Sequence, residues 1–109
     1  MTKLVVTAMA RQDLFEINSY ISAILLNPTA AKQMIKGITA KLRTLEQFPA
    51  IGKMVELEES SITYRYLLCG SYIAFYHIEN DLVLVDRILY SRRNYLKLLL
   101  GNQEEDEVD

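Results

Sequence analysis

Two arginines and two tyrosines crowd together near the C-terminal end of the chain. Arg92 and Arg93 lie between Tyr90 and Tyr95, and a further arginine, Arg87, precedes them. Guanidinium groups bind carboxylates and phosphates through several planar N–H donors, and aromatic rings stack on bases or fill partner pockets. This alternation predicts a cationic patch that contacts a macromolecular target. We assign the target-binding role to Arg87, Arg92, Arg93 and Tyr95.

The residues just before this patch are typical of a buried β-strand. Residues 82–85 are Leu-Val-Leu-Val, and Ile88 and Leu89 continue the apolar run past Asp86 and Arg87. An unbroken apolar run of this length favours a strand that is covered on both faces. A guanidinium inside such a strand is costly unless it is paired or reaches solvent. We therefore expect a rigidly held strand whose end presents the arginines.

A nuclease would need more than positive charge from these residues. RNA cleavage through the 2′-hydroxyl requires a base, a proton donor for the leaving oxygen and cations that stabilise the phosphorane. The residues available for such a site are Arg65, Arg87, Tyr90 and Arg93. Arginine stays protonated, and tyrosine, with a reference pKa of about 10, is a poor base. No catalytic residue is assigned unless the protein proves to be a nuclease.

Other titratable residues are interpreted structurally. His77, the single histidine, alternates with apolar residues, and we expect it to have a structural or surface role. Arg65 is equally compatible with a buried arginine that pairs with Asp86 across the sheet. Glu56 and Glu58 could act as bases, but solvated hairpin carboxylates are the simpler interpretation.

Composition limits the class of protein. The chain has 109 residues, half of them apolar, which suits one domain with one packed core. The formal net charge is −2, but five of the fourteen acidic residues lie in the last six positions. Residues 1–103 therefore carry twelve basic and nine acidic groups. We expect one domain over residues 1–102 and an acidic, disordered tail over residues 103–109, and a body less basic than a protein that grips many phosphates.

Several classes of site and location are not expected. One cysteine, Cys69, allows no internal disulfide, and together with one histidine it makes no zinc site. No glycine-rich phosphate loop is present, so we predict neither a metal nor a cofactor. No apolar run approaches the roughly 18 residues of a membrane span, and the N-terminus lacks a signal-peptide pattern. These features predict a cytoplasmic protein without a membrane segment.

A short strand at residues 2–7 and a first helix at residues 8–26 open the predicted fold. Within the helix, leucine and isoleucine recur at spacings of three and four and form one apolar stripe. Polar residues such as Arg11, Asp13 and Glu16 lie off this stripe. The stripe predicts that the helix packs on a sheet and leaves these charges in solvent.

A second helix follows directly. Asn27 can accept a hydrogen bond from an unpaired amide as the N-cap, and Pro28 suits the first helical position. The helix runs to about Gln47, because Phe48-Pro49 disfavours its continuation. Two helices joined across two or three residues make a helical hairpin.

The rest of the chain predicts strands joined by short turns. Residues 53–57 lead into a polar hairpin tip, and the further elements are strands at residues 62–69, 72–78 and 82–89 and a helix at residues 95–100. Short turns between successive strands favour an antiparallel meander. The fold class is therefore α+β, with an N-terminal strand and a two-helix hairpin packed on a small antiparallel sheet, in the order β-α-α-β-β-β-α.

These segments resemble the toxins of the RelE/ParE superfamily, which belong to bacterial type II toxin–antitoxin modules. The resembling pieces are A-R-Q-D-L-F-E-I at 10–17, N-P-T-A-A at 27–31, L-E-Q-F-P-A-I-G at 45–52, Tyr64-Arg65, S-Y-I-A-F-Y at 71–76 and V-D-R-I-L-Y-S-R-R-N-Y at 85–95. They occur in the family's order along nearly the whole chain. The resemblance implies the same hairpin-on-sheet fold, a growth-inhibiting activity and a cognate antitoxin that covers the hairpin and the sheet in a hetero-oligomer.

The resemblance implies one of two mechanisms. RelE-like members cut messenger RNA on the ribosome, whereas ParE-like members inhibit DNA gyrase and block replication without cleaving RNA. Ile73 stands where RelE-like sequences carry an arginine, and Leu67 stands at one of two lysine positions. The ending at residues 87–94 resembles the ParE-like pattern R-[IV]-L-H-x-x-x-D, with Tyr90 in place of the histidine and Asn94 in place of the aspartate.

We therefore expect a ParE-like, non-nucleolytic inhibitor of DNA gyrase, of the kind associated with plasmid stabilisation. The alternative is a RelE-like, ribosome-dependent endoribonuclease, that is, an mRNA interferase. A third interpretation is a degenerate member that binds its antitoxin without being toxic.

Overall fold

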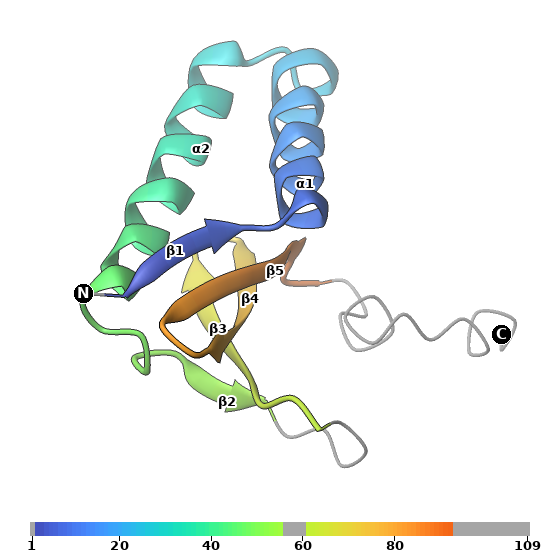
Figure 1. Ribbon diagram of the computed structural model, residues 1–109. Coiled ribbons are helices and arrows are strands. Elements are labelled where there is room, and N and C mark those ends of the chain that lie inside the picture. Colours follow the sequence, from blue (N-terminus) through green and yellow to red (C-terminus); the bar gives the residue numbers. More distant parts are fainter. Residues whose placement is uncertain (1, 56–60, 93–109) are drawn as a thin grey trace, which may run out of the picture.

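A computed structural model describes residues 2–55 and 61–92 of the chain (Figure 1). Two helices form a hairpin on one side of a β-sheet. The elements are β1 (Lys3–Val6), α1 (Ala8–Ser19), a π-helical turn η1 (Tyr20–Ile24), α2 (Pro28–Arg43), a short 3-10 helix η2 (Thr44–Glu46), β2 (Lys53–Val55), β3 (Tyr64–Cys69), β4 (Tyr72–Glu79) and β5 (Leu82–Tyr90). The predicted helical hairpin on a sheet is confirmed.

The sheet differs from the expected antiparallel meander in two respects. It has five strands in the order β1-β5-β4-β3-β2, because the short β2 also pairs with β3. β1 runs parallel to β5, with Lys3 opposite Leu82 and Val6 opposite Val85, so the sheet is mixed. Parallel neighbours need a long crossover, and here the crossover contains the helical hairpin and the antiparallel strands. β5 lies between β1 and β4. The unbroken apolar run predicted cover on both faces, but burial alternates along the strand, since Val83 and Val85 are buried whereas Leu82 and Leu84 are half-buried.

Side-chain caps begin both helices where the sequence predicts. The Ala10 amide donates to the Thr7 hydroxyl at 3.3 Å before α1. The Ala30 amide donates to the Asn27 side chain at 3.0 Å before α2, and Pro28 is the first helical residue. These caps satisfy backbone donors that an α-helix leaves unpaired at its start.

The main core lies between the hairpin and the sheet. Its largest fully buried members come from α2, η2, β4 and β5, and they are Ile38, Leu42, Leu45, Tyr76, Val83, Val85 and Ile88. Ile24 was expected on the apolar stripe of the first helix but is 66% exposed. The π-helical turn η1 changes the helical period from 3.6 residues, so the stripe does not continue to the tip of the hairpin.

The predicted C-terminal helix at residues 95–100 and the acidic tail at residues 103–109 lie outside the described residues, as do Arg93 and Tyr95. Within the described part of the chain, no helix combines the length and hydropathy that crossing a bilayer requires.

Candidate functional site

Arg87 on β5 is bound to a carboxylate of the first helix. Its Nε donates to Asp13 Oδ2 at 2.8 Å and its Nη2 donates to Asp13 Oδ1 at 3.0 Å. The two side chains are 14% and 8% exposed. The hydrogen bond with Asp13 raises the pKa of Arg87 above its ordinary value. The guanidinium that was predicted to contact a target therefore forms a bidentate ion pair within the protein.

The end of β1 explains why a carboxylate is buried there. β1 ends at Val6, opposite Val85, so β5 continues beyond its parallel neighbour. The Thr7 hydroxyl donates to the Val85 carbonyl at 2.8 Å, and the Ile88 amide donates to Asp13 Oδ2 at 2.9 Å. Asp13, expected in solvent off the apolar stripe, thus satisfies a strand amide as well as Arg87.

Arg65 on β3 is also held by internal partners, although not by the one expected. Its Nη1 donates to the Gly52 carbonyl at 2.9 Å and to the Ala50 carbonyl at 3.3 Å. The Tyr76 hydroxyl completes this corner, because it donates to the Pro49 carbonyl at 2.7 Å and accepts from the Gly52 amide at 2.9 Å. A Cβ at Gly52 would lie 2.6 Å from the Tyr76 hydroxyl. Arg65 fixes the loop before β2, and the predicted pairing with Asp86 is wrong.

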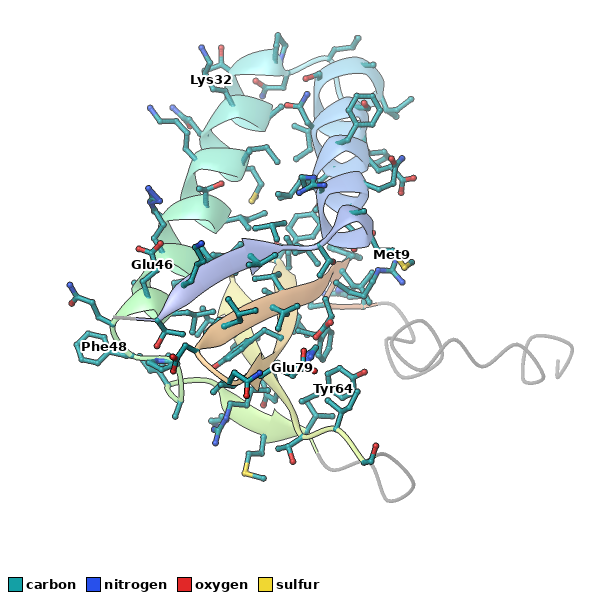
Figure 2. All side chains as sticks on the ribbon, in the orientation of Figure 1. Met9, Lys32, Glu46, Phe48, Tyr64 and Glu79 are labelled. Carbon is teal, nitrogen blue, oxygen red and sulfur yellow. The ribbon has the colours of Figure 1, made fainter. Side chains whose placement is uncertain are left out.

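Asp86 pairs with His77 instead. The two residues lie on neighbouring strands, and His77 Nδ1 lies 2.7 Å from Asp86 Oδ2. Glu79 approaches the other ring nitrogen at 3.7 Å, and the Tyr64 ring packs edge-on against the imidazole at 5.8 Å between centroids. Burial raises the pKa of Asp86, and its hydrogen bond with His77 opposes this shift. Figure 2 shows Tyr64 and Glu79 in the part of the sheet that is distant from the helical hairpin.

The sequence contains a signal for this pair that the alternation argument missed. The turn at Asn80 and Asp81 is tight, so Glu79 faces Leu82 and His77 faces Leu84. A register counted from the turn places Asp86 diagonally opposite His77, which is within reach of these side chains.

The predicted target patch is only partly assembled by the described residues. Tyr90 at the end of β5 is 42% exposed, and its ring packs at 5.7 Å from that of Tyr72. Arg92 follows and is exposed. Arg87 is directed to Asp13, and Arg93 and Tyr95 lie outside the described residues. Of the four residues assigned to target binding, the described structure therefore shows Arg92 alone as exposed, beside the exposed ring of Tyr90.

Two described residues of the alternative nuclease site, Arg65 and Tyr90, lie far apart, and Arg93 lies outside the described residues. Arg65 is opposite Tyr76, which is opposite Val85, whereas Tyr90 is opposite Tyr72. Val85 and Tyr90 are five residues apart along β5, which is a distance of about 16 Å at a rise of about 3.3 Å per residue. Arg65 and Tyr90 therefore lie near opposite ends of the sheet.

A groove lies between α1, η1 and the ends of β4 and β5, with a volume of about 610 Å³. Three tyrosines line it, namely Tyr20, Tyr72 and Tyr90, and we call it the tyrosine groove. Elsewhere, burial raises the pKa of the Cys69 thiol to about 11, which keeps it protonated and unreactive. Among the described residues, no group of three His, Cys, Asp or Glu side chains is placed to hold a metal ion.

Comparison with known proteins identifies the family. Residues 4–95 match the family described as "ParE toxin of type II toxin-antitoxin system, parDE". No curated protein sequence matches the chain. The fold is similar to that of a chain in the chromosomal ParDE toxin–antitoxin system from P. aeruginosa, with a TM-score of 0.68 and 21% identity over 83% of this chain and 96% of that chain.

A second similar fold is found in the toxin–antitoxin complex RelBE2 from Mycobacterium tuberculosis, with a TM-score of 0.50 and 21% identity over 82% of this chain and 96% of that chain. At such identities the structures support the fold, and the family match supports the class of protein. The predicted resemblance is confirmed on its ParE-like side. The chain belongs to the ParE toxin family and is a toxin of a type II toxin–antitoxin system.

Proposed function

We propose that this toxin stops growth by inhibiting DNA gyrase without cutting RNA. We further propose that it acts in the cytoplasm and that a cognate antitoxin holds it inactive in a hetero-oligomer. The family supports the antitoxin partner, and the internal binding of Arg65 and Arg87 supports the non-nucleolytic mechanism. A nuclease would need both guanidinium groups at the scissile phosphate, whereas each already binds partners within the fold.

The energetics favour leaving these arginines where they are. Arg87 binds Asp13 through two hydrogen bonds in a largely buried position. Removing one partner from a buried ion pair costs about 3–5 kcal/mol, because the other charge stays buried without compensation. Turning Arg87 toward a substrate would also leave the Asp13 carboxylate without its cation.

The His77–Asp86 pair does not supply a nuclease site either. A histidine oriented by a carboxylate can act as a general base. A scissile phosphate, however, needs nearby cations, and the described neighbours of this pair are Glu79 and the Tyr64 ring. Two carboxylates beside the imidazole would repel a phosphate, so this pair suits a structural role in the sheet.

Two measurements made together test the mechanism. Expression without antitoxin is expected to stop growth, and purified toxin is expected to inhibit DNA supercoiling by gyrase. Mapping of messenger RNA 5′ ends after induction is expected to show no new cuts within translated codons. Cuts at such positions would establish the endoribonuclease alternative, and normal growth would favour the degenerate member without toxicity.

The contact patch is tested by removing two of its charges. Arg92→Ala with Arg93→Ala is expected to abolish gyrase inhibition while leaving the thermal unfolding midpoint and antitoxin binding unchanged. The matched control is Lys32→Ala with Lys36→Ala, which removes two exposed cations from α2 and is expected to leave gyrase inhibition intact. Figure 2 shows Lys32 near the tip of the hairpin. Full inhibition by the double arginine variant would place the contact elsewhere.

A further inference from the structure

One side of α2 carries a row of cations. Lys32, Lys36 and Arg43 are exposed, and we call them the basic row. They lie four and seven positions apart, so at 3.6 residues per turn they share one side of the helix. No aspartate or glutamate occurs in the sequence between Glu16 and Glu46. The row therefore has no compensating charge on its own helix.

The rest of the described structure does not neutralise this row. Over residues 2–55 and 61–92, the ion pairs belong to His77 and Arg87, and none includes a residue of the basic row. Two carboxylates of the hairpin, Asp13 and Glu16, lie on α1 and line the tyrosine groove beside the end of β5. The hairpin is thus acidic on the α1 side and basic on the α2 side.

The C-terminal end of the chain has the complementary charge and enough length to reach the row. Five of the residues 104–109 are acidic, and Glu104 follows Arg92, the last described residue, after twelve positions. Twelve extended residues span up to about 40 Å. The end of β5 lies beside the base of α1 (Figure 1). A helix of the length of α2 measures about 24 Å and packed helices lie about 8–10 Å apart, so the connection is long enough.

A groove beside the basic row adds an apolar contact. It lies between α1 and α2, has a volume of about 470 Å³ and is lined by Leu14, Phe15 and Ile35 together with two lysines of the row. Phe15 is 64% exposed. Val108 is the only apolar residue among residues 102–109 and stands between two acidic residues. An apolar side chain flanked by carboxylates suits an apolar groove flanked by ammonium groups.

We propose that residues 104–109 bind the basic row of their own chain, with Val108 in the adjoining groove, and thereby keep nucleic-acid phosphates away from α2. Phosphates and carboxylates compete for the same cations. The acidic segment is part of the same chain, so its effective concentration at the row is on the order of millimolar. Because the basic row is separate from the target patch at Arg92 and Arg93, this inference goes beyond the gyrase mechanism and does not depend on it.

A spin label next to the acidic segment tests the contact in the full-length toxin. Gln103→Cys provides the attachment site without removing a charge, and the buried, protonated Cys69 thiol does not compete for the label. The nitroxide is expected to broaden the NMR amide signals of Lys32–Arg43 at low salt. The signals should recover at about 1 M salt, where the Debye length is about 3 Å. Broadening confined to the end of β5, or none, would overturn the proposal.

Charge reversal identifies the residues that hold the segment. Lys32→Glu with Lys36→Glu is expected to remove the broadening of the α2 signals. The matched control is Lys3→Glu with Lys53→Glu, which reverses two exposed cations on β1 and β2 and is expected to keep the broadening. Equal loss in both double variants would mean a general effect of net charge and would overturn the role of the basic row.

The shielding of α2 is tested with duplex DNA of random sequence in fluorescence anisotropy. The segment is neutralised by Glu104→Gln, Glu105→Gln, Asp106→Asn, Glu107→Gln and Asp109→Asn. This variant is expected to bind the DNA at least about tenfold more tightly than the unmodified toxin at low salt, because the phosphates gain access to the basic row. Adding Lys32→Glu and Lys36→Glu should remove that gain, whereas adding Lys3→Glu and Lys53→Glu should keep most of it. No gain on neutralisation, or a gain that survives reversal of the basic row, would refute the shield. Gyrase inhibition is not measured in this assay, so the mechanism and the shield can fail separately.

Discussion

Arg87 and Arg92 lie on or just beyond the same strand, but their surroundings differ completely. Arg87 lies in the part of β5 that extends beyond the end of β1. There β1 no longer pairs with the edge of β5, and Asp13 from α1 accepts the strand's hydrogen bond instead. Arg92 lies two positions beyond the last residue of β5 and is exposed. The comparison shows that the position of a strand end decides whether an arginine joins two elements or is available to a partner.

The largest difference is expected from removing the buried carboxylate. Asp13→Ala leaves the Arg87 charge and the Ile88 amide without their shared partner. We expect the free energy of unfolding in urea to fall by about 3 kcal/mol. Asp13→Asn should lose less, because it keeps a hydrogen-bond acceptor. Glu16→Ala, an exposed position on the same helix, should change stability by less than about 0.5 kcal/mol. A loss that small for Asp13→Ala would show that the pair does not hold α1 to β5.

A smaller loss is expected where β1 passes into α1. The Thr7 side chain caps the helix and also donates to the Val85 carbonyl. Thr7→Val keeps the shape and removes both hydrogen bonds, so we expect a loss of about 1–2 kcal/mol in chemical unfolding. The control is Thr39→Val on an exposed face of α2. Equal free energies of unfolding for the two variants would show that the Thr7 side chain does not stabilise the connection, and that backbone pairing alone joins β1 to β5.

The pH dependence of stability tests the residue next to Arg87. Burial raises the native pKa of Asp86 above the value of about 3.9 in the unfolded chain. At a pH between these two pKa values, Asp86 is therefore protonated in the folded protein and ionised in the unfolded chain. Its contribution to the free energy of unfolding therefore falls as the pH rises from the unfolded pKa to the raised native value. Asp86→Asn should remove this fall, and Asp81→Asn at the exposed turn should not. An NMR titration that gave Asp86 a midpoint at or below the ordinary value would contradict the prediction.

The smallest effect on stability is expected at the exposed end of the strand. Arg92→Ala should change the free energy of unfolding by less than about 0.5 kcal/mol, since no partner in the described structure holds its guanidinium. Its effect on gyrase inhibition should nevertheless be measurable as a reduced potency in the supercoiling assay. If Arg92→Ala lost as much stability as Asp13→Ala, Arg92 would have a structural role like that of Arg87, and the predicted difference between the two arginines would be refuted.

Local patterns in the sequence predicted the helical hairpin and most of the described strands but not their long-range partners. The apolar run at residues 82–85 predicted a buried strand, and Asn27-Pro28 predicted the start of α2, because each depends on neighbouring residues. The direction of β1 was not predictable in this way, since a strand's own periodicity contains no information about its neighbour. Asp13 and Arg87 lie 74 positions apart. Their pairing depends on where β1 ends, which single-strand patterns do not specify.

The candidate site was predicted unevenly for the same reason. Exposed residues at or beyond a strand end, such as Tyr90 and Arg92, can be identified from sequence because few other residues constrain them. The sequence left Arg65 equally compatible with a functional and a structural role, because the Gly52 carbonyl that it binds belongs to a loop whose position depends on Tyr76. The pairing of His77 with Asp86 is not predicted by the alternation of residues along β4, because it depends on the register between β4 and β5.

The parallel pairing of the first and last described strands has a consequence for synthesis of the protein. β5 is synthesised after β2, β3 and β4, so β1, whose neighbour in the sheet is β5, gains that neighbour only after the other strands have been made. The five-stranded sheet therefore stays incomplete until β5 (Leu82–Tyr90) has been made, although both helices and the other strands precede it in the chain.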